Sequence, residues 1–235
     1  MKNNTVLLLL STMLVCISCS DLEIKHIERY KNGNVKGIGM TKGSEKIGIW
    51  ALYDEQGFAV DSVAYVQGFK EGVSRTYNLM TGEMIAKGVY KQGKKQGIWE
   101  SYHDGGAVHT KEEFNKGKRI GEMAYFFADG TPKIITAIQN DKFHGEHKEY
   151  YPGGQISITG YYHNGVEDAT WKEYYEDGLI KEIYNYQAGL WHGTYEKYYP
   201  NGNIAEKGRY ELDNKKGTWE YFDTNGIVIS TKKYR

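Results

Sequence analysis

The chain has 235 residues, and its 30 lysine and arginine residues are balanced by 30 aspartate and glutamate residues. This balance gives no electrostatic preference for a polyanion, so we expect no nucleic-acid partner. The chain combines 29 glycines with an aromatic content of 14%. That combination excludes a disordered glycine-rich chain and favours many short strands joined by many turns.

Residues 1–18 have the features of a secretory signal peptide. Lys2 lies near the start, apolar residues fill most of 6–15, and small residues precede Cys19. The apolar run is shorter than the roughly 20 residues of a permanent membrane span, so we predict that the segment is cleaved.

The stretch Ile17-Ser18-Cys19 resembles a bacterial lipobox. The resemblance implies that Cys19 is the lipid attachment site and that its acyl chains hold the protein on a membrane without spanning it. An ordinary signal peptide with two incidental cysteines, Cys16 and Cys19, is the alternative. On the lipid interpretation the mature chain has no free thiol, so we expect neither a disulfide framework nor a cysteine metal site.

Residues 19–29 are expected to form a linker. Ser20, Asp21 and Glu23 weakly resemble the acidic export tag of some outer-membrane lipoproteins, with a plain solvated linker as the alternative. We therefore expect a lipid-anchored protein on the bacterial outer membrane, facing either the periplasm or the cell surface, with the membrane itself as one partner.

The remaining residues, 30–235, are expected to form one repeat domain with a period of 24 or 25 residues. An incomplete unit comes first, because Tyr30 in YKNGNV matches Tyr198 in YYPNGNI. Eight units follow, and their opening residues are Gly48, Gly72, Gly97, Gly121, Gly145, Ala169, Gly193 and Gly217.

Aromatic residues recur at fixed positions when each opening residue is counted as position zero. Because positions two and five differ by an odd number, either both faces of a sheet carry aromatic rings or a bulge intervenes. Position two carries Trp50, Trp99, Trp171, Tyr195 and Trp219, but Ser74, Met123 and His147 in the other units. Position five carries Tyr53, Tyr77, Tyr102, Phe126, Tyr150, Tyr174, Tyr198 and Phe222. Position seventeen carries Tyr65, Phe114, Ile138, Tyr162, Tyr186, Tyr210 and Tyr234, with Tyr90 one place later in its unit.

Each unit also carries two turn signals. One favours a type I turn followed by a left-handed glycine. Its glycines are Gly57, Gly82, Gly106, Gly130, Gly154, Gly178, Gly202 and Gly226. The other spans 68–72, 93–97, 117–121, 165–169 and 189–193.

Stretches of about 7 to 9 residues between the turns have the length and composition of β-strands. One unit therefore predicts one β-hairpin. The predicted fold is all-β, an elongated single-layer antiparallel meander of about eight 24-residue hairpins, roughly 75 Å long at about 4.8 Å per strand. Cross-strand aromatic stripes and contacts between neighbouring units would stabilise such a sheet.

The unit GTYEKYYPNGNI, with Tyr210 and Gly217 after it, resembles the bacterial MORN-repeat variant. The resemblance covers about 190 residues and implies stacked β-hairpins. Many members of that family are uncharacterised lipoproteins, and some carry an antitoxin label. The chain departs from the pattern at Ser74, Met123, His147 and Ala169, and at Pro132 in the second strand of the fourth unit. We therefore expect those units to be less regular than the others.

A search for catalytic or metal-binding chemistry finds little. His144, Glu146 and His147 form HGEH, but a strand does not set two histidines on one face as a helical zinc motif does. His144 and His192 occupy equivalent positions two units apart, so they are expected roughly 19 Å from each other. We predict no catalytic residues, no metal, no cofactor and no enzymatic activity.

Two surfaces could bind a partner. The exposed aromatic stripes suit a protein or glycan. Turn lysines of the early units could instead form a basic rim, with lysines that merely keep the ribbon soluble as the alternative; they are Lys94, Lys95, Lys116, Lys118, Arg119 and Lys142. Our hypothesis is a non-enzymatic membrane-anchored scaffold that binds another macromolecule at the bacterial envelope. The alternative is an antitoxin or immunity lipoprotein against an envelope toxin.

Overall fold

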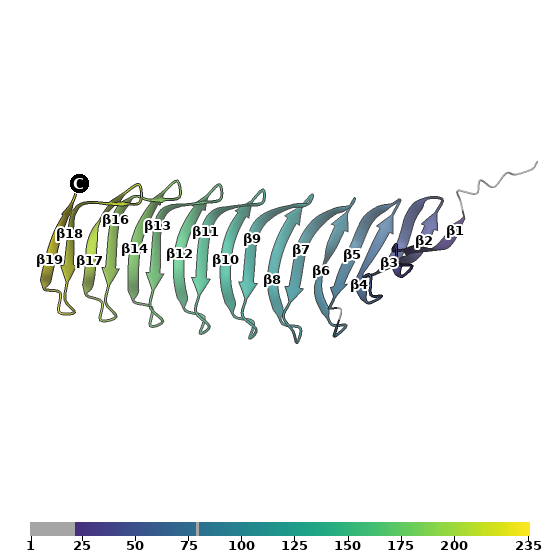
Figure 1. Cartoon of the computed structure of the whole chain (residues 1–235), viewed down its shortest axis with the longest axis horizontal. Helices are drawn as coiled ribbons and strands as arrows, with labels where there is room; N and C mark the ends of the chain where they lie inside the picture. The colour runs from purple at the N-terminus through teal and green to yellow at the C-terminus, as the bar shows by residue number, and fades with distance from the viewer. Residues whose placement is uncertain (1–21, 79) are drawn as a thin grey trace, which may run out of the picture.

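The computed structural model describes residues 22–78 and 80–235, which form one antiparallel sheet of 19 strands. Each strand pairs with the next one along the chain, so the strands lie in a single row from β1 to β19 (Figure 1). β14 pairs with both β15 and β16, which together occupy one place in the sheet. The predicted all-β single-layer meander is confirmed. The predicted signal peptide 1–18 and Cys19 lie outside the described residues.

The strands contain six to nine residues apart from the short β15. They are β1 Glu23–Arg29, β2 Val35–Lys42, β3 Glu45–Tyr53, β4 Ala59–Val66, β5 Phe69–Tyr77, β6 Met84–Lys91, β7 Lys94–Tyr102, β8 Val108–Asn115, β9 Lys118–Phe126, β10 Pro132–Gln139, β11 Lys142–Tyr150, β12 Ile156–His163, β13 Val166–Tyr174, β14 Ile180–Gln187, β15 Leu190–Trp191, β16 Gly193–Tyr198, β17 Ile204–Glu211, β18 Asn214–Phe222 and β19 Val228–Tyr234.

The repeat begins earlier than the sequence suggested. Residues 19–29 were expected to be a linker, yet Glu23–Arg29 form β1, which pairs with β2 along its length. β1 is the first strand of the incomplete unit. It was missed because His26 stands where five of the eight complete units have a tryptophan or tyrosine, and because this strand has no opening glycine.

One edge of the sheet is built from wide turns, which lie along the lower edge of the ribbon in Figure 1. In the first complete unit the Gly57 amide donates to the Asp54 carbonyl oxygen at 3.1 Å, and Gly57 has a φ of 94°. The same bond recurs at Gly106, Gly154 and Gly202. This geometry is the predicted type I turn followed by a left-handed glycine. At Gly82 the bond reaches back one residue further, to Asn78, because that unit has an extra residue.

The opposite edge is built from tight turns, and here the glycine spacing was misinterpreted. The chain reverses at Gln67 and Gly68, whose φ values of 49° and 77° fit a type I′ turn. Gly72, the other end of the predicted turn signal, lies inside β5 at a φ of 80°. It forms a bulge, because Tyr65 pairs with Lys70 but Val63 pairs with Ser74. Of the two glycines in each signal, only the first belongs to the turn.

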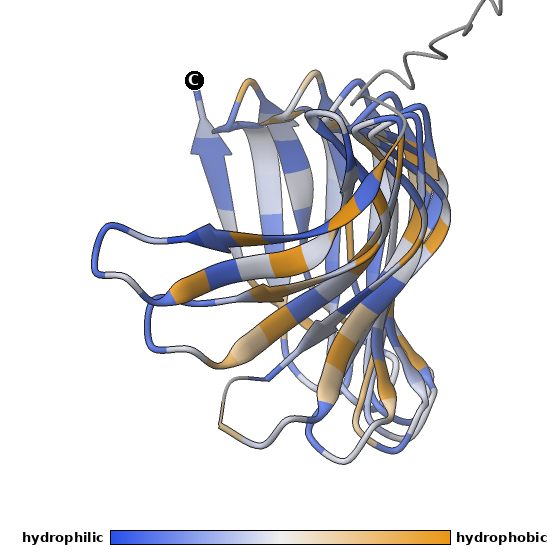
Figure 2. Ribbon diagram, turned by 90° about the vertical axis from the view of Figure 1, so that its right-hand side faces the viewer, coloured by the Kyte–Doolittle hydropathy of each residue, from blue (hydrophilic) through white to orange (hydrophobic). Residues whose placement is uncertain are grey.

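The sheet remains an open layer along its whole described length. Seen end-on, it is curved but does not close on itself (Figure 2). Pro132 was expected to make its unit irregular, but it is the first residue of β10, a place where a strand tolerates proline. Among the described residues, no helix has the length and hydropathy needed to cross a membrane. The most buried side chains are those of the repeat: Trp50, Val63, Ser74, Thr136 and Trp219.

Candidate binding surface

Positions two and five lie on opposite faces of the sheet. The Tyr198 hydroxyl donates to Glu196, two residues earlier on β16, so position five shares a face with position three. Tyr195, at position two, instead donates from its hydroxyl to Glu182 of β14. Both faces therefore carry aromatic rings. We call the position-two residues the inner row and the position-five residues the outer row.

The tryptophans of the inner row lie flat on glycine. Each has a glycine eleven residues earlier, on the preceding strand, and a Cβ placed on Gly208 would lie 2.2 Å from Cδ2 of Trp219. The indole N–H of Trp219 donates to the Arg209 carbonyl oxygen at 3.2 Å, and the Lys215 ammonium lies 3.7 Å from its ring centre on β18. The glycine–tryptophan pairs are Gly39–Trp50, Gly88–Trp99, Gly160–Trp171 and Gly208–Trp219.

Units without a tryptophan fill the same two places differently. Val63 stands in the glycine place opposite Ser74, and both side chains are buried. Thr136 pairs with His147 in the same way. In these two units the side chains are matched in size, which keeps the packing close without a second layer. Tyr184 and Tyr195 instead fill the two places of their unit with two buried rings.

Aromatic rings form a continuous ladder on this face from His147 to Tyr234. Residues of position seventeen stand edge-on between those of position two, as Tyr162 does against Trp171 with ring centres 5.2 Å apart. Such edge-to-face pairs contribute about 0.5–1.5 kcal/mol beyond the area they bury. Trp191 extends the ladder by stacking on Tyr195 at 5.7 Å. The inner row is therefore occupied by contacts within the sheet.

The outer row is half-buried and accessible. Tyr102 and Tyr198 each donate from the hydroxyl to the glutamate two residues earlier. Burial, reinforced by the Glu196 carboxylate, raises the pKa of Tyr198 to about 12. These two rings are fixed in direction and are only half-buried. Each member comes from a successive hairpin: Tyr53, Tyr77, Tyr102, Phe126, Tyr150, Tyr174, Tyr198 and Phe222.

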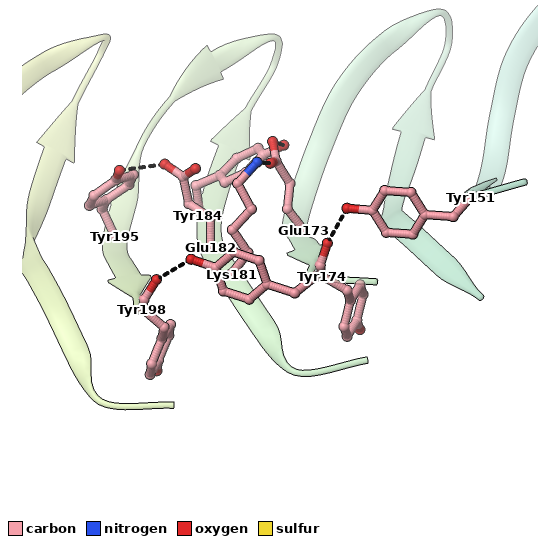
Figure 3. Close-up of polar contacts among 9 residues, drawn as sticks. Tyr151, Glu173, Tyr174, Lys181, Glu182, Tyr184, Tyr195 and Tyr198 are labelled. Carbon is pink, nitrogen blue, oxygen red and sulfur yellow. Dashed lines mark hydrogen bonds and ion pairs between the residues drawn. The ribbon is translucent and has the colours of Figure 1, made fainter. Parts of the chain in front are cut away.

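A second set of tyrosines, which the sequence analysis did not single out, connects neighbouring hairpins at the wide turns. The Tyr151 hydroxyl donates to the Tyr174 carbonyl oxygen at 2.7 Å (Figure 3), and Tyr175 bonds Tyr198 in the same way. Donor and acceptor are always 23 residues apart. The signal that could have found these bonds is the recurrence of tyrosine directly after position five. The same bond joins Tyr30 to Tyr53 and Tyr199 to Phe222. Tyr30 is therefore equivalent to Tyr199, and its sequence match to Tyr198 was wrong by one residue.

Figure 3 also shows a polar cluster between β13 and β16. Glu173 accepts hydrogen bonds from Lys181 at 3.0 Å and from Tyr184 at 3.3 Å, and Glu182 accepts one from Tyr195. Burial and the Glu182 carboxylate raise the pKa of Tyr195 well above its ordinary value. Burial and Glu173 do the same for Tyr184. Both phenols therefore stay protonated and hold the acids in place.

The histidines of HGEH are not brought together as one site. His147 is buried against Tyr162 and Trp171, and its Nε2 bonds Glu149 at 3.1 Å. His144 instead lies beside His163, with ring centres 5.1 Å apart. Glu146 pairs with Lys148. In the part of the chain that the structure describes, no group of three or more histidine, cysteine or acidic side chains is arranged to hold a metal ion.

Comparison with known proteins gives one informative match. The chain has no match among curated proteins. Two solved structures, described as "Crystal Structure of TcdB2-TccC3" and "Crystal Structure of TcdB2-TccC3-Cdc42", are each 10% identical to it, over 84% and 85% of its length, with TM-scores of 0.23 and 0.22. The chain spans 13% of the length of either of those chains. The family model described as MORN repeat variant matches residues 143–164, 167–188 and 191–211. These segments coincide with β11–β12, β13–β14 and β15–β17, so residues 143–211 match three consecutive MORN-variant repeats.

Proposed function

We propose that this chain is a non-enzymatic, lipid-anchored repeat scaffold on the bacterial outer membrane, which binds another macromolecule through the outer face of its sheet. The outer row is the observation that carries the proposal. It offers one half-exposed aromatic ring per hairpin along the length of the repeat, and the hydroxyls of Tyr102 and Tyr198 are held by glutamates of their own strands. Aromatic side chains held rigidly in this way lose little entropy on binding.

The hydrogen bonds that polar side chains make within the sheet support a scaffold over an enzyme. Glu173 accepts hydrogen bonds from Lys181 and from a tyrosine hydroxyl, and Glu182 accepts one from another tyrosine hydroxyl. Each acts in the sheet as a hydrogen-bond partner. A catalytic acid or base would need a partner on a substrate instead.

The anchor is tested by labelling growing cells with radioactive palmitate. We expect the wild-type protein to take up the label and to fractionate with the outer membrane, and Cys19→Ser to lose both properties. Cys16→Ser is the matched control, because it removes the other cysteine of the same segment and should keep the label. Label that persists in Cys19→Ser, or a wild-type protein that stays in the cytoplasm, would contradict the proposal.

Binding by the outer face is tested with a photo-crosslinking amino acid in living cells. Tyr198 and Lys197 are adjacent on β16, so their side chains leave opposite faces of the sheet. We expect a discrete cross-linked product from position 198 and none from position 197. Equal capture from both positions, or from neither, would rule out the outer face as the binding surface.

A further inference from the structure

The zero net charge of the chain conceals an acidic edge along the wide turns and a basic stretch of the opposite edge. The wide turns carry Lys31 and the acids Asp54, Glu55, Glu83, Asp104, Asp129, Glu176, Asp177 and Asp223. Three successive tight turns, at 91–94, 115–118 and 139–142, carry five lysines and one acid, Asp141. Asp141 is already engaged with Arg119. The basic rim anticipated from the sequence therefore lies on the tight-turn edge.

The lysines of this rim project from a rigid base. Successive tight turns are joined by backbone hydrogen bonds: the Gly93 amide donates to the Lys70 carbonyl oxygen, and the Gly117 amide donates to that of Lys95, both at 2.8 Å. Two adjoining clefts lie between these turns, which we call the rim groove. The first has a volume of about 490 Å³ and is lined by Lys91, Gln92, Lys94, Gln96, Asn115 and Lys116.

The fold itself gains nothing from this arrangement of charge. Lys91 and Lys94 are direct cross-strand partners, and like charges placed opposite each other destabilise a sheet. Lys116 adds a third ammonium group to the same cleft. Within residues 22–78 and 80–235, none of the three ammonium groups has an ion-pair partner. An anionic ligand would relieve this repulsion.

The second cleft has a different character. It has a volume of about 480 Å³ and shares Lys91 and Gln92 with the first. Its apolar wall is the cross-strand pair Val66 and Phe69, whose side chains are 54% and 60% exposed. Glu71 also lines this cleft, where its carboxylate accepts a hydrogen bond from the backbone N–H of Gln92 at 2.7 Å. A negative group on the ligand is therefore repelled from the apolar end and attracted to the lysine end.

We propose that the rim groove binds an extended acidic peptide segment, with an apolar side chain against Val66 and Phe69 and the following carboxylates on Lys91, Lys94 and Lys116. Neighbouring tight turns are two strand spacings apart, roughly 9.6 Å, which about three residues of extended peptide span. Side-chain amides of Gln92, Gln96 and Asn115 match the donors and acceptors of a peptide backbone. The proposal rests on the scaffold function above and names the kind of partner.

The test uses the full-length protein and a fluorescein-labelled hexapeptide in which one phenylalanine precedes three glutamates, with fluorescence anisotropy as the readout. We expect the triple variant Lys91→Gln, Lys94→Gln, Lys116→Gln to bind at least about tenfold more weakly, since each exposed ion pair contributes modestly. Replacing the glutamates of the peptide with glutamine should weaken binding to a similar extent, and so should higher salt.

Two controls keep the result interpretable. The control triple variant replaces Lys25, Lys31 and Lys197 with glutamine. It removes the same charge from exposed sites away from the groove and should bind the peptide like wild type. Phe69→Ser should weaken binding at low and high salt alike, because it removes an apolar contact. Far-UV circular dichroism confirms that each variant keeps its sheet.

The proposal is overturned by equal binding to the two triple variants, by no binding of the peptide, or by groove-dependent binding to phosphatidylglycerol vesicles without binding of the peptide. Cross-linking from position 198 distinguishes a failure of the groove proposal from a failure of the scaffold proposal. If position 198 still captures a partner while the wild-type protein does not bind the peptide, only the groove proposal fails. Capture lost in the wild type sinks the scaffold proposal.

Discussion

Replacement of Gly208 by alanine tests whether the inner tryptophans depend on a bare backbone beneath them. The backbone of Gly208 lies outside the left-handed region, so alanine causes no φ strain there. Its Cβ would lie 2.2 Å from Cδ2 and 2.3 Å from Cε2 of Trp219, whereas carbon atoms in contact are normally about 3.5–4.0 Å apart. The indole ring must therefore move by more than about 1 Å.

The cost follows from what holds that ring. Trp219 is fully buried and its N–H donates to the Arg209 carbonyl oxygen at 3.2 Å. Overpacking costs about 1–3 kcal/mol, and loss of the hydrogen bond adds about 1 kcal/mol. We expect the free energy of unfolding to fall by about 2–4 kcal/mol, measured by urea unfolding followed by tryptophan fluorescence.

Gly153→Ala is the matched control. Gly153 also lies outside the left-handed region, but a Cβ there meets only the flexible side chain of Gln155 in an exposed turn. Equal unfolding free energies for the two variants, within about 0.5 kcal/mol, would refute the reasoning. The double variant Gly208→Val, Trp219→Ser reproduces the Val63–Ser74 arrangement. It should be less destabilised than the sum of its single variants.

Three further outcomes follow from the same contacts. Ala169 has a φ of 57° where other units have glycine, so Ala169→Gly should stabilise the protein by about 0.5–1 kcal/mol in urea unfolding; a loss of stability would contradict this. Tyr175→Phe removes the hydrogen bond to Tyr198 and should lower the free energy of unfolding by about 0.5–1.5 kcal/mol. Tyr161→Phe changes an exposed side chain and should lower it less; equal losses would count against the turn bonds. Burial raises the pKa of Tyr162 and Tyr198 to about 12, above the roughly 10 of an unfolded tyrosine. The folded chain then holds more protons than the unfolded chain above about pH 10, so stability should fall between about pH 10 and 12 in pH-dependent urea titrations, and a flat profile there would show that these phenols ionise freely.

The sequence predicted the meander because its period repeats the strand and turn chemistry in every unit. It could not assign the paired glycines, since a type I′ turn and a strand bulge both require a positive φ. Gly68 and Gly72 satisfy the same conformational demand in different structures. The sequence also left β1 unassigned, because that strand is held in place by pairing with β2 rather than by repeat residues of its own.

The candidate binding surface on the outer face was predicted only in part. The aromatic positions were visible, but which face remained accessible depends on the glycine beneath each inner tryptophan. That signal is present in the sequence, where Gly208 precedes Trp219 by the same interval as Gly39 precedes Trp50. Interpreting it requires knowing that the two positions lie on neighbouring strands with the ring above the backbone. The rim groove likewise depends on turns that are far apart in sequence but adjacent in the sheet.

The division between cohesion and recognition follows from how each position is constrained. An inner-row side chain packs against the residue eleven positions earlier, as Trp99 does against Gly88 and Ser74 against Val63. The first residue after a tight turn is not packed in this way: Phe69 and Lys94 are exposed, and each pairs across its turn with another exposed residue. That place can hold Phe69 in one unit and Lys94 in the next without disturbing the ladder. Residues at the tight-turn rim of such a sheet can therefore vary while those of the inner face stay fixed.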